Sequence, residues 1–204
     1  MSGNEEFNDW LQAYAYAWDR PGREAIEAAV WKDYGIEGAV FVLDMTGFSR
    51  LTAQFGALHY LSMVRRMQIA AKAIIRRTGG ELVKFEADNC FARFKTVDDA
   101  LQAGLLLHTH FTMLNRETSE DYDIHISIGI DWGWYLLVDE TDYYGNPVNR
   151  ASKLGEDMAA ADQILMTNDA FEKGVTLPPG LEAEAAKADV AGSSIGIRVI
   201  NLER

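Results

Sequence analysis

Two short apolar runs that each lead into an aspartate constrain the fold of this chain most. The run 39–43 reads Ala-Val-Phe-Val-Leu and precedes Asp44, and the run 81–87 reads Glu-Leu-Val-Lys-Phe-Glu-Ala and precedes Asp88. Such runs predict buried strands, and open α/β sheets bind ligands at strand ends. Two carboxylates at one sheet edge would repel each other unless a cation lay between them, and hard divalent cations take oxygen ligands. For either aspartate alone, capping of the following helix or turn is the simpler interpretation.

The residues after Asp44 strengthen the ligand interpretation. They are Thr46, Gly47, Phe48 and Ser49, and a short helical pattern follows them. Glycine allows a tight turn, and the free backbone amides at the start of a helix favour phosphate. An acid for a metal and amides for phosphates, a few residues apart, suit a nucleoside triphosphate.

A third block, 142–154, reads Asp-Tyr-Tyr-Gly-Asn-Pro-Val-Asn-Arg-Ala-Ser-Lys-Leu. With this block the chain resembles the class III nucleotidyl cyclases, the catalytic domains of adenylyl and guanylyl cyclases. That family has an apolar strand ending in Asp before Gly-Phe-Ser/Thr, a Lys four residues before a second Asp, and an Asp-x-x-Gly-x-x-Val-Asn-x-Ala-Ser-Arg block. All three occur here in that order, and the resemblance covers about 37–171, with a weaker tail to Leu202.

The resemblance implies a metal site. Asp44 and Asp88 match the family's metal ligands, and the backbone carbonyl of Met45 would be the third protein ligand. The cofactors implied are two divalent cations, Mg²⁺ or Mn²⁺, with Ca²⁺ as the alternative in an inactive protein. The metals would activate the attacking ribose oxygen and neutralise charge on the leaving pyrophosphate.

The resemblance also implies which residues bind the nucleotide. Lys84 and Asp142 match the pair that reads adenine, in which Lys donates to a ring nitrogen and Asp accepts from the 6-amino group. Guanine would leave the Asp unpaired, so the pair indicates ATP over GTP. Asn149 matches the ribose-orienting Asn, and Lys153 occupies the position of a catalytic Arg. Taken singly, these residues also fit a surface lysine, a turn aspartate and the start of an ordinary amphipathic helix.

Three departures from the family pattern bear on activity. The Lys153 ammonium is a point charge, whereas the planar guanidinium fork of an Arg at this position could donate two parallel hydrogen bonds. The segment 130–141 is shorter than the arm that reaches a second subunit in the family. The C-terminal loop, where the family carries a Lys for the terminal phosphate, has Lys187 as the candidate substitute without the usual Lys-Gly-rich context.

These departures bear on oligomeric state, because a complete site in this family takes residues from two subunits. The net charge of −12 adds repulsion between like chains, whereas the Trp-rich stretch 132–137 favours an interface. We therefore expect a largely monomeric, ATP-binding domain with weak or absent cyclase activity. The alternative is a homodimeric adenylyl cyclase that makes cyclic AMP and pyrophosphate; a hydrolase fits less well, because no positioned general base stands out.

Composition excludes several other classes. The acidic balance argues against nucleic acid as a partner and against unaided binding to anionic lipid. Cys90, the single cysteine, leaves no disulfide framework and fits core packing. His59, His108, His110 and His125 have no metal-ligand spacing, so we expect structural or surface roles for them. The sequence has neither a leader pattern nor an apolar run of membrane-spanning length, so we expect a cytoplasmic protein.

The order of elements predicts an α+β fold: a ferredoxin-like class III cyclase sandwich, with helices packed on a mixed sheet. We expect a helical extension over 1–36 and the cyclase homology domain over 37–204. In the extension, Trp10, Tyr14 and Trp18 would share a helix face that packs on the main domain or on a partner. A tight hairpin between strands 81–87 and 90–95 would hold Asp88 at its tip. Asn168 would cap a short helix. The helix 57–77 would bury one face, made of Leu58, Leu61, Val64, Met67, Ala71 and Ile74.

Overall fold

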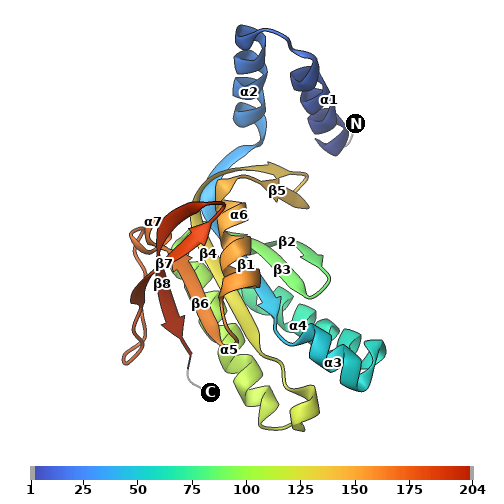
Figure 1. Ribbon diagram of the computed structural model, residues 1–204, viewed down its shortest axis with the longest axis vertical. Coiled ribbons are helices and arrows are strands. Elements are labelled where there is room, and N and C mark those ends of the chain that lie inside the picture. Colours follow the sequence, from blue (N-terminus) through green and yellow to red (C-terminus); the bar gives the residue numbers. More distant parts are fainter. Residues whose placement is uncertain (1–2, 203–204) are drawn as a thin grey trace.

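The structure, a computed structural model, describes residues 3–202, with the side chains at 3 and 48–51 left out of the description. Residues 1–2 and 203–204 of the predicted domains therefore lie outside the described residues. The fold is α+β, as predicted, with an eight-stranded mixed sheet in the order β2-β3-β1-β4-β6-β8-β7 and with β5 added beside β4 (Figure 1). Only β4 and β6 run parallel among the paired strands described.

The strands are β1 Gly35–Met45, β2 Glu81–Glu86, β3 Asn89–Phe94, β4 Ile126–Val138, β5 Asp142–Tyr144, β6 Gln163–Thr167, β7 Glu184–Val190 and β8 Ser193–Asn201. The α-helices are α1 Gly3–Tyr16, α2 Arg20–Tyr34, α3 Phe48–Phe55, α4 Ala57–Arg77, α5 Val97–Asn115, α6 Asn146–Ser152 and α7 Asn168–Phe171. A 3₁₀ turn covers Glu120–Tyr122, and α6 continues as a π-helix over Lys153–Met158.

Strand β1 lies at the centre of the core, with Ala39 to Leu43 fully buried. Phe41 and Leu43 pack with residues of α4 and α5 on one face of the sheet. Val40 and Val42 pack against α6 on the other face. Because both faces are covered, the strand is a continuous apolar run, and its prediction from the sequence is confirmed. Cys90 is buried in the same core, also as predicted.

Helix α4 buries a different face at its start from the one predicted. Leu58 and Leu61 are 83% and 58% exposed, so their assignment to the core is wrong. Tyr60 and Met63 take the inward positions of the first turns, while the other four predicted residues are buried. Apolar residues lie on two neighbouring faces at the start of this helix. Tyr60 was not predicted to be buried because its side chain is only partly apolar.

Thr167, and not Asn168, caps the short helix α7. The Thr167 hydroxyl accepts a hydrogen bond from the amide of Ala170 at 3.1 Å. The predicted cap is therefore wrong by one residue. Both residue types make good N-caps, so the sequence alone did not separate them.

The segment predicted to be a shortened arm is a continuation of β4. It pairs with β5, with Leu136 opposite Tyr144 and Val138 opposite Asp142. We call the hairpin 134–144 the arm; it lies beside the N-terminal helices (Figure 1). None of the helices in the described part of the chain is long and apolar enough to cross a membrane.

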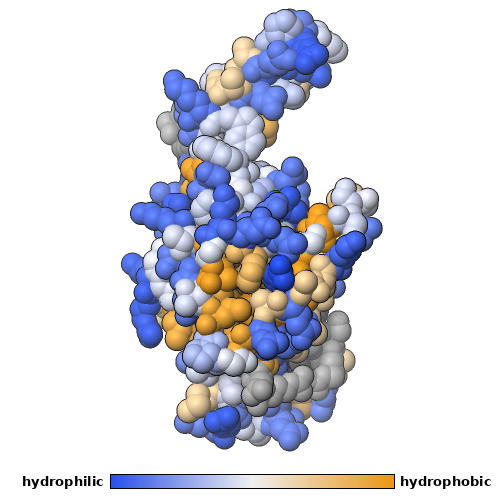
Figure 2. All heavy atoms as spheres, turned by 90° about the vertical axis from the view of Figure 1, so that its left-hand side faces the viewer, coloured by the Kyte–Doolittle hydropathy of each residue, from blue (hydrophilic) through white to orange (hydrophobic). Residues whose placement is uncertain are grey.

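Helices α1 and α2, here called the N-terminal extension, project as a narrow lobe from one end of the molecule (Figures 1 and 2). The predicted aromatic face is wrong at Trp18, which follows the end of α1 and is 88% exposed. The extension packs on the arm through Phe7 of α1 and Val30 of α2, which join Val138 of β4 in one buried cluster. Trp10 packs against this cluster, as predicted, whereas Tyr14 is 39% exposed.

Candidate functional site

Asp44 and Asp88 come together at one end of the sheet. Leu43 of β1 pairs with Cys90 of β3, so Asp44 lies beside the tight β2–β3 turn that carries Asp88. Burial raises the pKa of Asp44 to about 7, and the negative charges of Asp88 and Glu156 add to the shift. The electrostatic crowding expected of two carboxylates at a sheet edge is therefore present.

Tyr60 holds Asp88 from the side of α4. Its hydroxyl donates to Asp88 Oδ2 at 2.6 Å, and its side chain is only 3% exposed. Tyr60 was not among the site residues predicted from the sequence. The available signal was a tyrosine within the apolar pattern of α4, since a buried tyrosine hydroxyl usually needs a polar partner.

The donor set here fits a hard divalent cation, which takes carboxylate and carbonyl oxygens. Met45 has a buried side chain, so only its backbone could contribute an oxygen. Among residues 3–202 no group of three or more His, Cys, Asp or Glu side chains is arranged as a metal site. A cation at Asp44 and Asp88 would therefore need further oxygens from the backbone and from nucleotide phosphates.

The turn after β1 begins α3 as predicted. Gly47 has a φ of 99°, the left-handed conformation that glycine adopts readily, and the helix starts at Phe48. The Thr46 amide already donates to the carbonyl of His125 at 3.0 Å. Of the four amides predicted to bind phosphate, those of Gly47, Phe48 and Ser49 therefore remain as candidates. The side chains of Phe48 and Ser49 lie outside the described residues.

Lys84 and Asp142 meet, although they come from strands far apart in the sequence. Lys84 Nζ lies 3.2 Å from Asp142 Oδ1 and 3.0 Å from Glu86 Oε2. Asp142 also accepts from the amide of Tyr143 at 2.9 Å and from the hydroxyl of Tyr144 at 2.8 Å. Burial raises the pKa of Asp142, but the hydrogen bonds from Tyr144 and Lys84 outweigh it and lower that pKa below its usual value.

Asn149 lies in α6 and Lys153 at the point where α6 becomes π-helical. Asn149 is exposed. Lys153 Nζ pairs with Asp157 Oδ2 at 2.7 Å, one turn further along. Single turns of π-helix are often found at functional sites. Lys153, the residue predicted to occupy the position of a catalytic Arg, is thus already paired within its own helix.

The α6 segment lies directly on the sheet backbone. A Cβ atom added at Gly129 of β4 would come within 2.0 Å of the carbonyl oxygen of Ala151. One added at Gly155 would come within 2.8 Å of the Gly129 amide nitrogen and of the Val42 carbonyl oxygen. Glycine at both positions is what allows this close approach.

A buried ion pair, which was not predicted from the sequence, joins α6 to the sheet. Asp131 of β4 is fully buried and accepts from the Arg150 guanidinium, the Thr167 hydroxyl and the Trp132 amide. Burial raises the pKa of Asp131, and the hydrogen bonds from Arg150 and Thr167 oppose that shift. Arg150 directly follows Asn149, so the pair fixes the part of α6 that carries the predicted ribose-orienting residue.

Lys187, the predicted substitute for a phosphate-binding lysine, lies exposed on β7, the edge strand of the sheet. In the strand order, β4, β6 and β8 separate it from β1. The structure therefore does not bring Lys187 to the end of β1 that carries Asp44.

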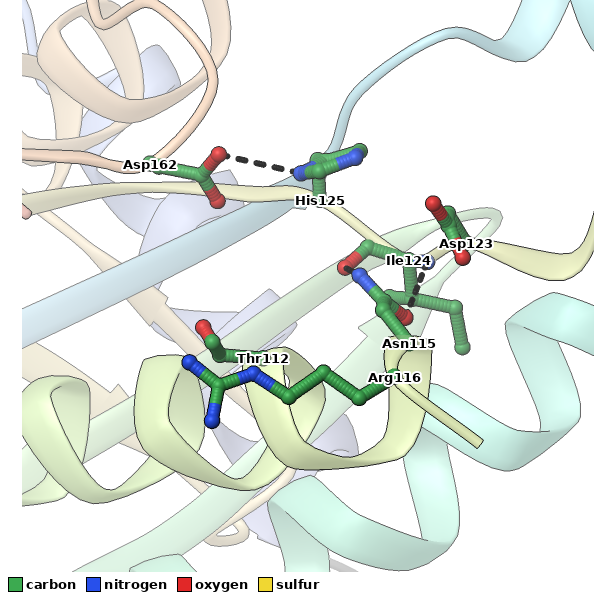
Figure 3. Close-up of a pocket in the computed structure, with 7 residues that line it drawn as sticks. All are labelled: Thr112, Asn115, Arg116, Asp123, Ile124, His125 and Asp162. Atoms are coloured by element: carbon green, nitrogen blue, oxygen red, sulfur yellow. Dashed lines mark hydrogen bonds and ion pairs between the residues drawn. The ribbon is translucent and has the colours of Figure 1, made fainter. Parts of the chain in front are cut away.

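Two of the histidines form a structural pair with a buried acid. Asp162 Oδ2 lies 3.0 Å from His125 Nδ1, and Asp162 Oδ1 lies 3.7 Å from His108 Nε2. Figure 3 shows His125 and Asp162 facing each other beside a cavity of about 330 Å³ that Arg116 also lines. These contacts agree with the structural role predicted for both histidines.

No protein-family model matches the chain. An adenylate cyclase from Streptomyces coelicolor (strain ATCC BAA-471 / A3(2) / M145) is 27% identical over 141 residues, which is 65% of this chain and 35% of the relative. A protein from Rhizobium meliloti (strain 1021), whose name also refers to adenylate cyclase, is 22% identical over 116 residues, 57% of this chain and 20% of the relative. The chain thus spans about a third or less of each relative's length.

Solved structures are similar over more of the chain. The adenylyl cyclase CyaB from P. aeruginosa superposes with a TM-score of 0.68 and 20% identity, covering 83% of this chain and 96% of that one. The adenylate/guanylate cyclase/hydrolase from Silicibacter pomeroyi gives a TM-score of 0.68 and 23% identity, with 83% and 98% coverage. The chain therefore has the fold of the class III adenylyl and guanylyl cyclase catalytic domains, which confirms at the level of fold the resemblance predicted from its motifs.

Proposed function

We propose that the chain is a class III adenylyl cyclase-like domain that binds ATP together with divalent cations and is largely monomeric, with weak or no cyclase activity. The strongest support is the meeting of Lys84 and Asp142 at 3.2 Å. A cation and an anion held side by side offer a donor and an acceptor to the edge of a purine. Adenine complements that pair, whereas the guanine carbonyl would leave the carboxylate without a donor.

Asp44 and Asp88 are the residues that would hold the cations. Bound Mg²⁺ or Mn²⁺ would neutralise charge on the phosphates and favour loss of the ribose 3′ proton. The raised pKa of Asp44 supports the assignment, because a crowded carboxylate gains most from a neighbouring cation. The amides of Gly47 to Ser49 would bind the phosphates of the same nucleotide. Lys84, Asp142 and Asn149 would contact a nucleotide held by the aspartates of a second chain, so a monomer carries two separate half-sites.

Two observations support weak activity. Lys153 is paired with Asp157 and lacks the planar fork of Arg. In addition, the arm is packed on the chain's own N-terminal extension. A stable interface usually buries about 1,200–2,000 Å² in total, and an arm that the extension already covers on one face offers less area to a partner. We also propose that the protein works in the cytoplasm, where ATP is supplied.

The test of binding is calorimetric titration of the full chain with ATP, with and without Mg²⁺. We expect metal-dependent binding that is lost in the Asp44→Ala, Asp88→Ala double variant. The Asp33→Ala variant is the matched control, since Asp33 is an exposed aspartate on α2. Equal binding of ATP by the double variant and the wild type would overturn the metal assignment.

The second candidate, an active homodimeric adenylyl cyclase, is favoured by Trp134, which is 58% exposed on the arm and could enter an interface. Sedimentation velocity with ATP and Mg²⁺, followed by a cyclic AMP assay, separates the two candidates. A tight dimer with robust cyclic AMP formation would establish the homodimeric enzyme and refute the monomeric proposal.

A further inference from the structure

Tyr144 connects the predicted adenine-reading residue to the outside of the cyclase fold. Its hydroxyl donates to Asp142 Oδ2 at 2.8 Å. The other carboxylate oxygen, Asp142 Oδ1, pairs with the Lys84 ammonium and accepts a hydrogen bond from the Tyr143 amide. A carboxylate offers about four acceptor positions, so Asp142 can still accept from an adenine amino group. The Tyr144 hydroxyl fixes the plane in which that remaining acceptor points.

Tyr144 itself is half exposed, at 48%, and depends on a neighbour for its own position. That neighbour is Phe7 of α1, whose ring lies 6.0 Å from the Tyr144 ring, centroid to centroid, and 8° from parallel. Phe7 is only 5% exposed and also packs edge-on against Tyr34 of α2, with ring centroids 5.1 Å apart. Offset-stacked and edge-on pairs of this kind are favourable and orient both rings.

A second contact holds α1 on the same hairpin. The amide of Asn4, in the first turn of α1, donates to Asp139 Oδ2 at 2.7 Å. Asp139 lies in the turn of the arm, where its φ of 51° is in the left-handed region. Phe7 and Asn4 therefore bind the face and the turn of the arm from one helix.

We infer that the N-terminal extension sets the purine selectivity of the proposed nucleotide site, with Phe7 stacking on Tyr144 and Tyr144 acting as the positioning residue for Asp142. The inference rests on the proposed function and adds a means of regulation to it. A change that lifts α1 from the arm releases Tyr144. Asp142 can then rotate, and the site loses part of its preference for a 6-amino over a 6-oxo purine.

The test compares the affinities of the full chain for ATP and GTP, each with Mg²⁺, at a chain concentration at which sedimentation velocity shows the dimer, because Lys84 and Asp142 of one chain would read the base of a nucleotide held by the aspartates of the other. Tyr144→Phe keeps the ring and its stacking but removes the hydroxyl, so the ratio of ATP to GTP affinity should fall about fivefold to tenfold. Phe7→Ala should lower the ratio about threefold, and Phe7→Leu, which keeps the packing, should lower it less. Tyr16→Phe and Leu11→Ala are matched controls on exposed positions of α1 and should leave the ratio unchanged.

A second measurement does not need nucleotide. Titration of the Asp142 carboxyl followed by NMR should show its pKa rising toward the usual value in Tyr144→Phe and in Phe7→Ala, but in neither control. A purely structural role for Phe7 would lower stability without moving this pKa.

The two proposals can fail separately. A wild type that binds ATP with metal, together with variants whose affinity ratio and Asp142 titration are unchanged, overturns the inference alone. An effect of Tyr144→Phe without any effect of Phe7→Ala refutes the part played by the extension. A wild type that binds neither nucleotide refutes the proposed function and the inference with it.

Discussion

The hydroxyl of Tyr60 lies 2.6 Å from Asp88 Oδ2, so the tip of the β2–β3 hairpin is fixed to helix α4 by one side chain. The hydrogen bond is charge-assisted and comes from a residue that is almost fully buried. Asp88 is therefore oriented by the core, although it lies on a turn.

Tyr60→Phe should lower the free energy of unfolding by about 1.5–3 kcal/mol, the range for a hydrogen bond to a charged group. The ring stays in place, so little packing is lost. Urea unfolding measures the change, with Tyr16→Phe on exposed surface as the control. The same variant should weaken metal-dependent ATP binding, because Asp88 loses its orientation; unchanged binding would show that Tyr60 only stabilises the fold.

The raised pKa of Asp44 makes stability depend on pH. The folded-state pKa is about 7 against an ordinary value of 3.8. Between these values the folded chain holds a proton that the unfolded chain releases, so stability falls as pH rises through this window and levels off above it. Metal-free Asp44→Asn should therefore be more stable than the wild type at pH 8, by about 1–2 kcal/mol after allowance for solvent screening.

At pH 4 the two proteins should have nearly equal stability. Thermal unfolding at both pH values, without metal, gives the comparison. Addition of Mg²⁺ at pH 8 should stabilise the wild type and not Asp44→Asn. If Asp44→Asn were less stable than the wild type at pH 8, the Asp44 carboxylate would not be destabilised by burial and by the charges of Asp88 and Glu156.

Loss of the buried acid of β4 should be the most damaging of these changes. Asp131→Ala leaves the Arg150 guanidinium without its carboxylate and should cost about 3 kcal/mol in unfolding free energy. Asp131→Asn keeps a hydrogen-bond acceptor and should cost less. Chemical denaturation of both variants measures the difference; equal costs would mean that the charge has no part in holding α6.

Lys153 and Asp157 give a test of why activity should be weak. Asp157→Asn frees the lysine, and Lys153→Arg restores the planar fork, so each should raise the rate of cyclic AMP formation, together by about tenfold. The pair is exposed, at 43% and 58%, so stability should change by less than about 0.5 kcal/mol. Initial rates at saturating ATP and Mg²⁺ are the measurement. Unchanged rates in a chain shown to dimerise would place the defect elsewhere.

The sequence predicted those parts of the fold that depend on local pattern. Strand β1 is a continuous apolar run because both of its faces are buried, and the β2–β3 turn was recognisable around Asp88. Strand β7 was not predicted, since Ala, Lys and Glu, which fill it, have low strand propensity. It forms because β8 supplies a long antiparallel partner.

From the sequence, a site residue could be predicted only where it matches a position of a family motif. Lys84 and Asp142 could be named from their motifs, but their ion pair depends on the arm lying beside β2. Tyr60 and Asp131 belong to no motif quoted for the family, and their partners lie on other elements. Tertiary contacts of this kind leave no periodic signal in a single sequence.

The close approach of Gly129 and Gly155 has a consequence for motion. Where helix and sheet meet backbone to backbone, no layer of side chains lies between them that could repack and let one slide over the other. Asn149 and Lys153 are therefore carried by a unit that moves as one rigid body with β4 and β1. Any closing of the site around a nucleotide has to come from displacement of the arm, the α3 turn or a second chain relative to that unit.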